Sequence, residues 1–190
     1  AFEMAAELAS AEGIKVRTLF INDDVAVEAS LYTIGRRGVA GNFFVMKAVG
    51  AAAEAGADLD EVVRIGEKVN AATRTMGVAL SSCIPPAKGT PLFEIAEDEM
   101  EIGVGIHGEP GRRRAKIGTA DEIVDELLHA IVPDLPFTSG DEVALMVNGL
   151  GGTPISELYI LYDTAHSRLD GQGITVGRSY VGEYCTALDM

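Results

Sequence analysis

The stretch at 101–111 reads EIGVGIHGEPG, and its pattern changes partway along. Apolar residues alternate with glycine or charged residues up to position 106, which predicts a strand over 102–107. Glycines then surround His107, and glycine lets the backbone turn where other residues cannot. An imidazole held there can act as a base, a metal ligand or a nucleophile. A histidine that only closes a strand edge would look the same, so the spacing alone leaves both interpretations open.

The residues around and after this stretch predict short strands followed by alternating helices and strands. Thr119 and Glu122 form a capping-box pattern, which predicts that a helix begins at 120. A loop rich in proline and glycine at 85–89 separates the first two strands. The segments expected in this half are strands at 77–83, 92–95, 102–107, 143–147 and 174–180, with helices at 120–132 and 155–169.

The residues before position 76 predict three helices and one strand. Helical spacing of apolar residues places the helices at 2–12, 40–56 and 59–74, and the strand is expected at 15–21. Gly13 suits the end of the first helix, and Asp58 with Glu61 suits the start of the third. The second helix is apolar nearly all round, which is typical of a buried helix.

These elements predict an α/β fold with α+β character in its second part. We expect two subdomains, 1–75 and 76–190, each with mixed strands flanked by helices. The boundary between them lies near Thr75.

Two other motifs can be read as ligand sites or as plain structure. Asp23 and Asp24 follow the expected strand at 15–21 and can bind a metal or a ribose, or they can cap the next turn. The glycine-rich turn at 148–154 lies between a strand and a helix, where phosphate can bind. It lacks the GxxxxGK[ST] pattern, and Thr153 with Pro154 equally fits a structural helix start with Thr153 at the N-cap.

Composition excludes several classes of partner. The 190 residues carry a net charge of −14, which disfavours nucleic acid and anionic membrane surfaces. The basic run 112–114 can meet a small anion but more simply stays solvated. Cys83 and Cys185 lack metal or disulfide spacing, so we expect buried thiols in a reducing cytoplasm. No apolar run is long enough to span a bilayer, and His129 and His166 stand late in helices, where a histidine favours the C-terminal dipole.

Four ordered blocks of sequence carry a resemblance to a known family. The chain resembles the substrate-binding subunit of dihydroxyacetone kinase, the DhaK type, across essentially its whole length. The blocks are GRRGVAG at 35–41, EMEIGVGIHGEPG at 99–111, GGTPISELY at 151–159 and YCTALDM at 184–190. The resemblance implies a DhaK-like fold, in which 1–75 is the C-terminal part of the first subdomain and 76–190 is the second.

The resemblance also implies a role for His107, which matches the histidine that bonds covalently to dihydroxyacetone as a hemiaminal. Only a carbonyl compound can form such a tether, so the reaction itself separates the ketone from polyols such as glycerol. The tether needs an unprotonated ring, so binding should fail in acid. Glu109 can orient the ring, or it can simply stabilise the turn.

The family pattern further implies residues and partners outside this chain. The GSGHEP segment with a second catalytic histidine and the GD segment with a substrate-binding aspartate are not present, so we expect this piece alone not to turn over. The phosphoryl donor would be ADP or ATP with Mg on a DhaL-type subunit or domain, linked to the phosphotransferase system or to ATP. We expect no cofactor or metal site in this chain, a homodimer, and a cytoplasmic location.

Two alternatives stay open beside the kinase. A DhaK-like paralogue can bind the ketone and serve as a transcriptional coactivator without kinase activity. A reading independent of the family is a phosphate-binding α/β module that uses the loop 148–154.

Overall fold

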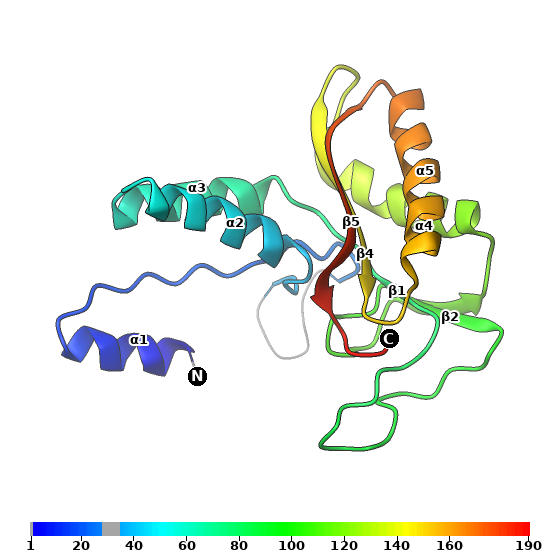
Figure 1. The fold of residues 1–190 in the computed structure, drawn as a ribbon, viewed down its shortest axis with the longest axis horizontal. Coiled ribbons are helices and arrows are strands. Elements are labelled where there is room, and N and C mark those ends of the chain that lie inside the picture. Colours follow the sequence, from blue (N-terminus) through cyan, green and yellow to red (C-terminus); the bar gives the residue numbers. More distant parts are fainter. Residues whose placement is uncertain (1, 28–34) are drawn as a thin grey trace.

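The computed structural model describes residues 2–27 and 35–190, and Figure 1 shows their arrangement. Helix α1 spans Phe2–Ala11 and lies apart from the rest, with none of its residues buried. Gly13 ends it as expected, with φ +81°, and the Ile14 N–H donates to the Ala9 carbonyl at 3.0 Å. No described helix has both the length and the apolar character needed to cross a bilayer.

Helices α2 (Gly41–Glu54) and α3 (Leu59–Ala71) form an antiparallel hairpin. The Asp58 side chain accepts the Glu61 N–H at 2.9 Å, which confirms the predicted start of α3. The prediction of a buried α2 was wrong: only Gly41 and Val45 are buried. The cause is that α2 packs mainly along α3, so its outer face meets no described layer.

The predicted strand at 15–21 was also wrong. This segment runs extended from α1 toward the body without a ladder, and Phe20 is 71% exposed. A strand needs a hydrogen-bonded neighbour, and the described chain offers one only at Asp24, which forms an isolated parallel bridge with Thr75.

A small antiparallel sheet follows, in the order β1–β2–β3. Its strands are β1 (Val78–Ala79), β2 (Glu99–Ile102) and β3 (Arg113–Lys116). The segment at 92–95 is not a strand, so that prediction was wrong, and the strand expected at 102–107 is displaced to Glu99–Ile102. Gly103 ends β2 because its φ of +81° leaves the strand region, and the residues beyond it form a loop.

The last part is a parallel pair of strands joined through a helix. Strand β4 (Glu142–Leu150) pairs with β5 (Thr175–Thr186), and α5 (Ile155–Gly171) makes the crossover. Helix α4 (Ala120–Ile131), followed by the 3-10 turn Val132–Asp134, packs beside α5. The capping box predicted for α4 is present, with Thr119 and Glu122 bonded to each other's backbone N–H groups.

Buried side chains gather around both sheets. One cluster packs the small sheet against α4 and consists of Met100, Ile102 and Ile123. The other joins the small sheet to the end of the chain and consists of Ala79, Cys83, Val104, Ala187 and Met190. These helices and small sheets confirm the mixed α/β class, whereas the subdomain boundary near Thr75 stays a prediction.

Candidate functional site

His107 lies in the loop between β2 and β3, residues 103–112, which we call the His107 loop. The Gly108 N–H donates to the Gly105 carbonyl at 3.0 Å and closes a tight turn with Ile106 and His107 at its centre. Gly108 has φ +76°, which suits glycine. Ile106 packs onto the core, whereas the His107 side chain is 81% exposed. The turn therefore projects the imidazole outward from a fixed base.

Glu109 folds back under this turn and holds His107 at two points. Its Oε2 accepts the His107 N–H at 2.8 Å, and its Oε1 lies 3.0 Å from the ring Nδ1. Burial opposes ionisation, but hydrogen bonds from its own backbone and from His107 outweigh it and lower the pKa of Glu109. Gly105 leaves room for this carboxylate, because a Cβ there would overlap Oε2.

This arrangement selects one nitrogen of the ring. An ionised Glu109 can only accept a hydrogen bond, so Nδ1 carries the hydrogen and Nε2, on the exposed ring, keeps its lone pair. A neutral Nε2 can attack an electrophile, take a proton or bind a metal. In 2–27 and 35–190, no three His, Cys, Asp or Glu side chains come together to hold a metal ion.

Arg37 joins the His107 loop to the acidic pair at 23–24. Its Nη2 donates to the Gly103 carbonyl at 2.7 Å and its Nη1 donates to the Pro110 carbonyl at 3.1 Å. Its Nε donates to Asp24 Oδ2 at 2.7 Å, and the second Asp24 oxygen accepts the Ala26 N–H. Burial raises the pKa of Asp24, although the Ala26 N–H and the Arg37 guanidinium pull it down. In the sequence, the only sign of this role is a short basic loop between two glycines, 35–38.

Asp23 is fully buried and caps the start of α2. Its carboxylate accepts the N–H groups of Val39 and Gly41 at 2.9 and 2.8 Å and the Thr75 hydroxyl at 2.5 Å. Asp24 makes the turn bond to Ala26. The structure thus favours the capping interpretation of the acidic pair over a metal or ribose site.

The predicted loop 148–154 is shorter than expected, because β4 continues to Leu150, and the turn that follows is filled by the chain itself. A Cβ on Gly149 would overlap Glu183, and one on Gly151 would overlap the Leu188 carbonyl. The Gly152 N–H donates to the Met190 carbonyl at 3.1 Å. The helix start follows Pro154, which is itself the N-cap, so the predicted N-cap at Thr153 was wrong. These contacts support a structural role over a phosphate cradle.

The remaining candidate residues are structural in this arrangement. Cys83 is buried as predicted, whereas Cys185 is only half-buried; burial raises the pKa of both thiols, and neither forms a disulfide. Such neutral thiols are poor nucleophiles. All three arginines at 112–114 are exposed, as predicted, and two of them pair with acids: Arg113 with Glu126 and Arg114 with Glu101. His129 and His166 lie on α4 and α5, away from the loop that carries His107.

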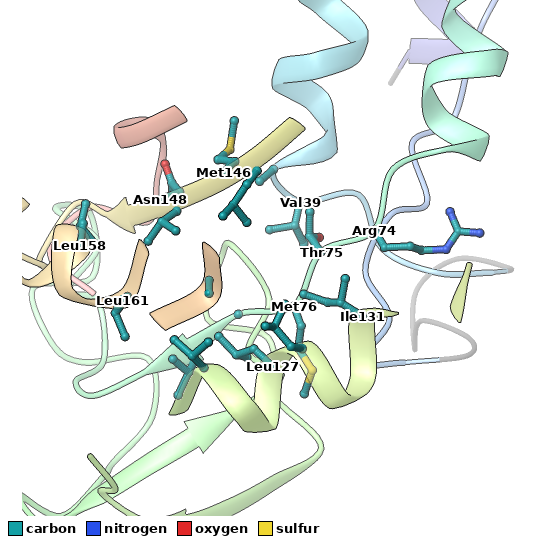
Figure 2. Close-up of a pocket in the computed structure, with 18 of the residues that line it drawn as sticks. Val39, Arg74, Thr75, Met76, Leu127, Ile131, Met146, Asn148, Leu158 and Leu161 are labelled. Atoms are coloured by element: carbon teal, nitrogen blue, oxygen red, sulfur yellow. The ribbon is translucent and has the colours of Figure 1, made fainter. Parts of the chain in front are cut away.

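A cavity of about 1070 Å³ opens between β4, α4 and α5, and Figure 2 shows its wall. Its lining is mostly apolar and includes Met76, Leu127, Met146 and Leu161, which Figure 2 labels. His107 does not line it, although its neighbour Ile106 does. Polar residues such as Arg74, Thr75 and Asn148 also line it, but apolar side chains dominate and His107 is not among the lining residues, so the His107 loop is the better candidate.

Comparisons with known proteins match the chain over its whole length to one family. The Dak1 domain model matches residues 1–190. The chain is 48% identical to "PTS-dependent dihydroxyacetone kinase 1, dihydroxyacetone-binding subunit DhaK" of Listeria innocua and covers 57% of it. It is 43% identical to "PEP-dependent dihydroxyacetone kinase, dihydroxyacetone-binding subunit DhaK" of Escherichia coli and covers 60% of it. All of this chain is matched in both, so it spans somewhat over half the length of these relatives.

The solved structures that match this chain come from the same family. The dihydroxyacetone kinase operon co-activator Dha-DhaQ superposes with a TM-score of 0.90 at 34% identity, over the whole of this chain and 58% of that chain. The dihydroxyacetone kinase from C. freundii in complex with AMP-PNP and Mg²⁺ superposes with a TM-score of 0.83 at 32% identity, over the whole of this chain and 34% of that one. The family expected from the four sequence blocks is confirmed: the chain belongs to the Dak1 family of dihydroxyacetone kinases and their DhaK-type subunits.

Proposed function

We propose that this chain forms the dihydroxyacetone-binding part of a dihydroxyacetone kinase, and that His107 holds the ketone as a covalent hemiaminal. The observation that carries the proposal is the outward Nε2 of His107, whose partner nitrogen is engaged by Glu109. The names of the Listeria and E. coli relatives support the substrate, since both are dihydroxyacetone-binding subunits.

The tether needs one bond to form and one proton to move. The Nε2 lone pair forms a C–N bond to the carbonyl carbon, and the π electrons of the carbonyl move onto its oxygen. That oxygen takes up a proton from water, and the Nδ1 proton passes through Glu109, whose Oε1 lies 3.0 Å away, to the hydroxide that remains, so that in sum one proton moves from the ring to the oxygen. The product is a neutral hemiaminal, so no oxidant or leaving group is required.

The tether would serve the phosphoryl transfer by positioning. A covalently held ketone keeps its primary hydroxyl in one place, which removes much of the entropy that a second reactant would otherwise lose. We expect the base that activates this hydroxyl to come from residues outside this chain. The complex of the C. freundii kinase with AMP-PNP and Mg²⁺ supports a nucleotide in the reaction, and we expect a DhaL-type subunit or domain to hold it.

The relatives also bear on two further points, the phosphoryl donor and the range of substrates. Phosphotransferase-linked subunits reach 48% identity, which favours that phosphoryl donor over direct use of ATP. The "L-erythrulose 1-kinase" of Mycolicibacterium smegmatis, at 44% identity, indicates that hydroxyketones one carbon longer belong to the same substrate class. Homodimerisation and a cytoplasmic location stay predictions.

The test compares adducts by native mass spectrometry of the intact protein. We expect one dihydroxyacetone per chain, no adduct with glycerol, and no adduct with the His107→Ala variant. His129→Ala is the matched control, because His129 is also exposed but lies on α4. An undiminished adduct on His107→Ala would overturn the assignment.

A second candidate is a ketone sensor, which the TM-score of 0.90 to the DhaQ co-activator favours. A sensor would form the same adduct but release no phosphorylated product. Kinase assays of the intact protein with nucleotide-loaded and phosphotransferase-linked partners separate the two. Adduct without product under both conditions would support the sensor.

A further inference from the structure

The contacts of Arg37 point beyond the histidine itself. We propose that Arg37 is a positioning residue for His107: anchored on Asp24, it ties together the two ends of the His107 loop. The inference rests on the proposed function of His107 and names a residue through which that function depends on the first half of the chain.

Arg37 reaches both ends of the loop with separate nitrogens. Gly103, bonded through Nη2, directly follows β2, and Pro110, bonded through Nη1, lies three residues before β3. The guanidinium is planar and rigid, so the two carbonyls it holds cannot separate without breaking a bond to it. His107 lies between these two points along the chain and is held at its base by both.

The anchor of Arg37 is fixed as well. Asp24 is 1% exposed, and its two oxygens are bonded to Arg37 and to the Ala26 N–H. Arg37 itself is only 11% exposed, so water competes little for its donors. Asp23, the next residue back, is bonded into the start of α2. The position of the loop is therefore set by the core of the first half and not by the small sheet alone.

Arg37 also lies against the turn that Glu109 supports. Its Nη1 is 3.0 Å from the point where a Cβ on Gly105 would stand, and the Glu109 carboxylate is closer still. The cation, the turn and the carboxylate that orients the ring thus form one packed unit. A shift of Arg37 should move Glu109 and change the direction of Nε2.

The test uses substitutions that keep charge or size. Arg37→Ala would leave Asp24 buried without a counter-ion and can fail to fold. Arg37→Lys keeps the cation but cannot reach both carbonyls at once. Asp24→Asn keeps both carbonyl contacts but weakens the anchor. Arg74→Lys is the matched control, because Arg74 also bonds one aspartate, Asp134, and two backbone carbonyls, away from the His107 loop.

Two readouts are taken on the intact protein. Hydrogen exchange of the amides in 103–112 reports whether the loop is held. The dihydroxyacetone concentration at which half of the protein carries the adduct reports whether the His107 ring is positioned to bond the ketone. We expect Arg37→Lys and Asp24→Asn to speed the exchange and to weaken the apparent affinity about tenfold each, since misplacing a reacting group by ~1 Å can cost 10²-fold. Arg74→Lys should change neither.

Each other outcome has a defined meaning. Unchanged exchange in Arg37→Lys would overturn the proposal, and so would faster exchange with unaltered affinity. If the unsubstituted protein formed no adduct that depends on His107, the proposed function would fail with it. That case is recognised without any Arg37 variant, so the two failures are distinguishable.

Discussion

Two glycine-rich loops follow strands in this chain, and they use glycine for opposite purposes. The His107 loop uses it to turn sharply over the Glu109 carboxylate and to leave one side chain 81% exposed. The loop 148–154 uses it to let the backbone at 188–190 and the Glu183 side chain approach closely, so these groups fill the space that a ligand would need. Figure 1 shows the C-terminus beside the end of β4, where this packing occurs.

The difference teaches that glycine content does not mark a binding loop. The role of a glycine in such a loop depends on which atom a Cβ at its position would contact. At Gly105 that atom belongs to a flexible carboxylate, whereas at Gly151 it is a backbone carbonyl. The first position can therefore govern chemistry, and the second governs folding.

The largest expected effect is that of Gly151→Ala on stability. The position has φ +112° and its Cβ would overlap the Leu188 carbonyl, so backbone strain and a clash add together. We expect a loss of at least about 3 kcal/mol in the free energy of unfolding, measured by urea denaturation.

Gly140→Ala is the control for this strain, because Gly140 has φ +99° but nothing within 4 Å of its Cβ position. It should cost roughly 1–2 kcal/mol. Equal losses for the two variants would show that 183–190 does not pack against the loop as described.

Gly105→Ala should act on binding and hardly on folding. Its Cβ would push the Glu109 carboxylate away from the ring, and a side-chain end can move at little cost. We expect the apparent affinity for dihydroxyacetone to fall about 10- to 100-fold, with stability reduced by about 1 kcal/mol. Native mass spectrometry across a ketone titration measures the first and urea denaturation the second.

Gly50→Ala is the matched control, since Gly50 lies inside α2 with open space around it. It should leave binding unchanged and raise stability by about 0.5–1 kcal/mol. A binding loss equal to that of Gly105→Ala would remove the specific role of the turn.

Glu109→Gln should weaken the adduct about tenfold, which is less than displacing the whole side chain. Glutamine has one acceptor oxygen where Glu109 uses two, so either the His107 N–H or the ring nitrogen loses its bond. Glu122→Gln tests for a general effect, because Glu122 also accepts two bonds, both from Thr119 in the cap of α4. Similar binding losses for both variants would contradict the orienting role.

Local signals explain which parts of this fold could be predicted from sequence. Helices α3 and α4 begin where Asp58 and Thr119 predicted, because a cap is decided by residues three positions apart. The predictions of strands at 15–21 and 92–95 were wrong because a strand depends on a hydrogen-bonded partner that its own sequence does not contain.

The same reasoning applies to the candidate site. His107 stood out because its glycines are adjacent in sequence. The role of Arg37 was missed because its two loop contacts lie 66 and 73 residues away along the chain. The adjacent acids at 23–24 and the basic pair between glycines at 35–38 were the available signals, and only the fold shows which partners they contact.

The smallest expected effect is a pH dependence that distinguishes the two loops. The pKa of Glu109 is lowered in the folded chain despite its burial, by bonds from its own backbone and from His107. Its support for the His107 loop is therefore complete above its usual value of 4.5 and is lost as pH falls through the lower folded value. The loop 148–154 is tied by backbone bonds, such as the Ala187 N–H to the Leu150 carbonyl, which do not titrate. NMR should show the His107 amide resonance shifting below pH 4.5, while that of Gly152 stays in place as long as the protein is folded. Parallel shifts at both amides would mean that acid loosens the whole molecule, and that the carboxylate does not set the His107 loop apart.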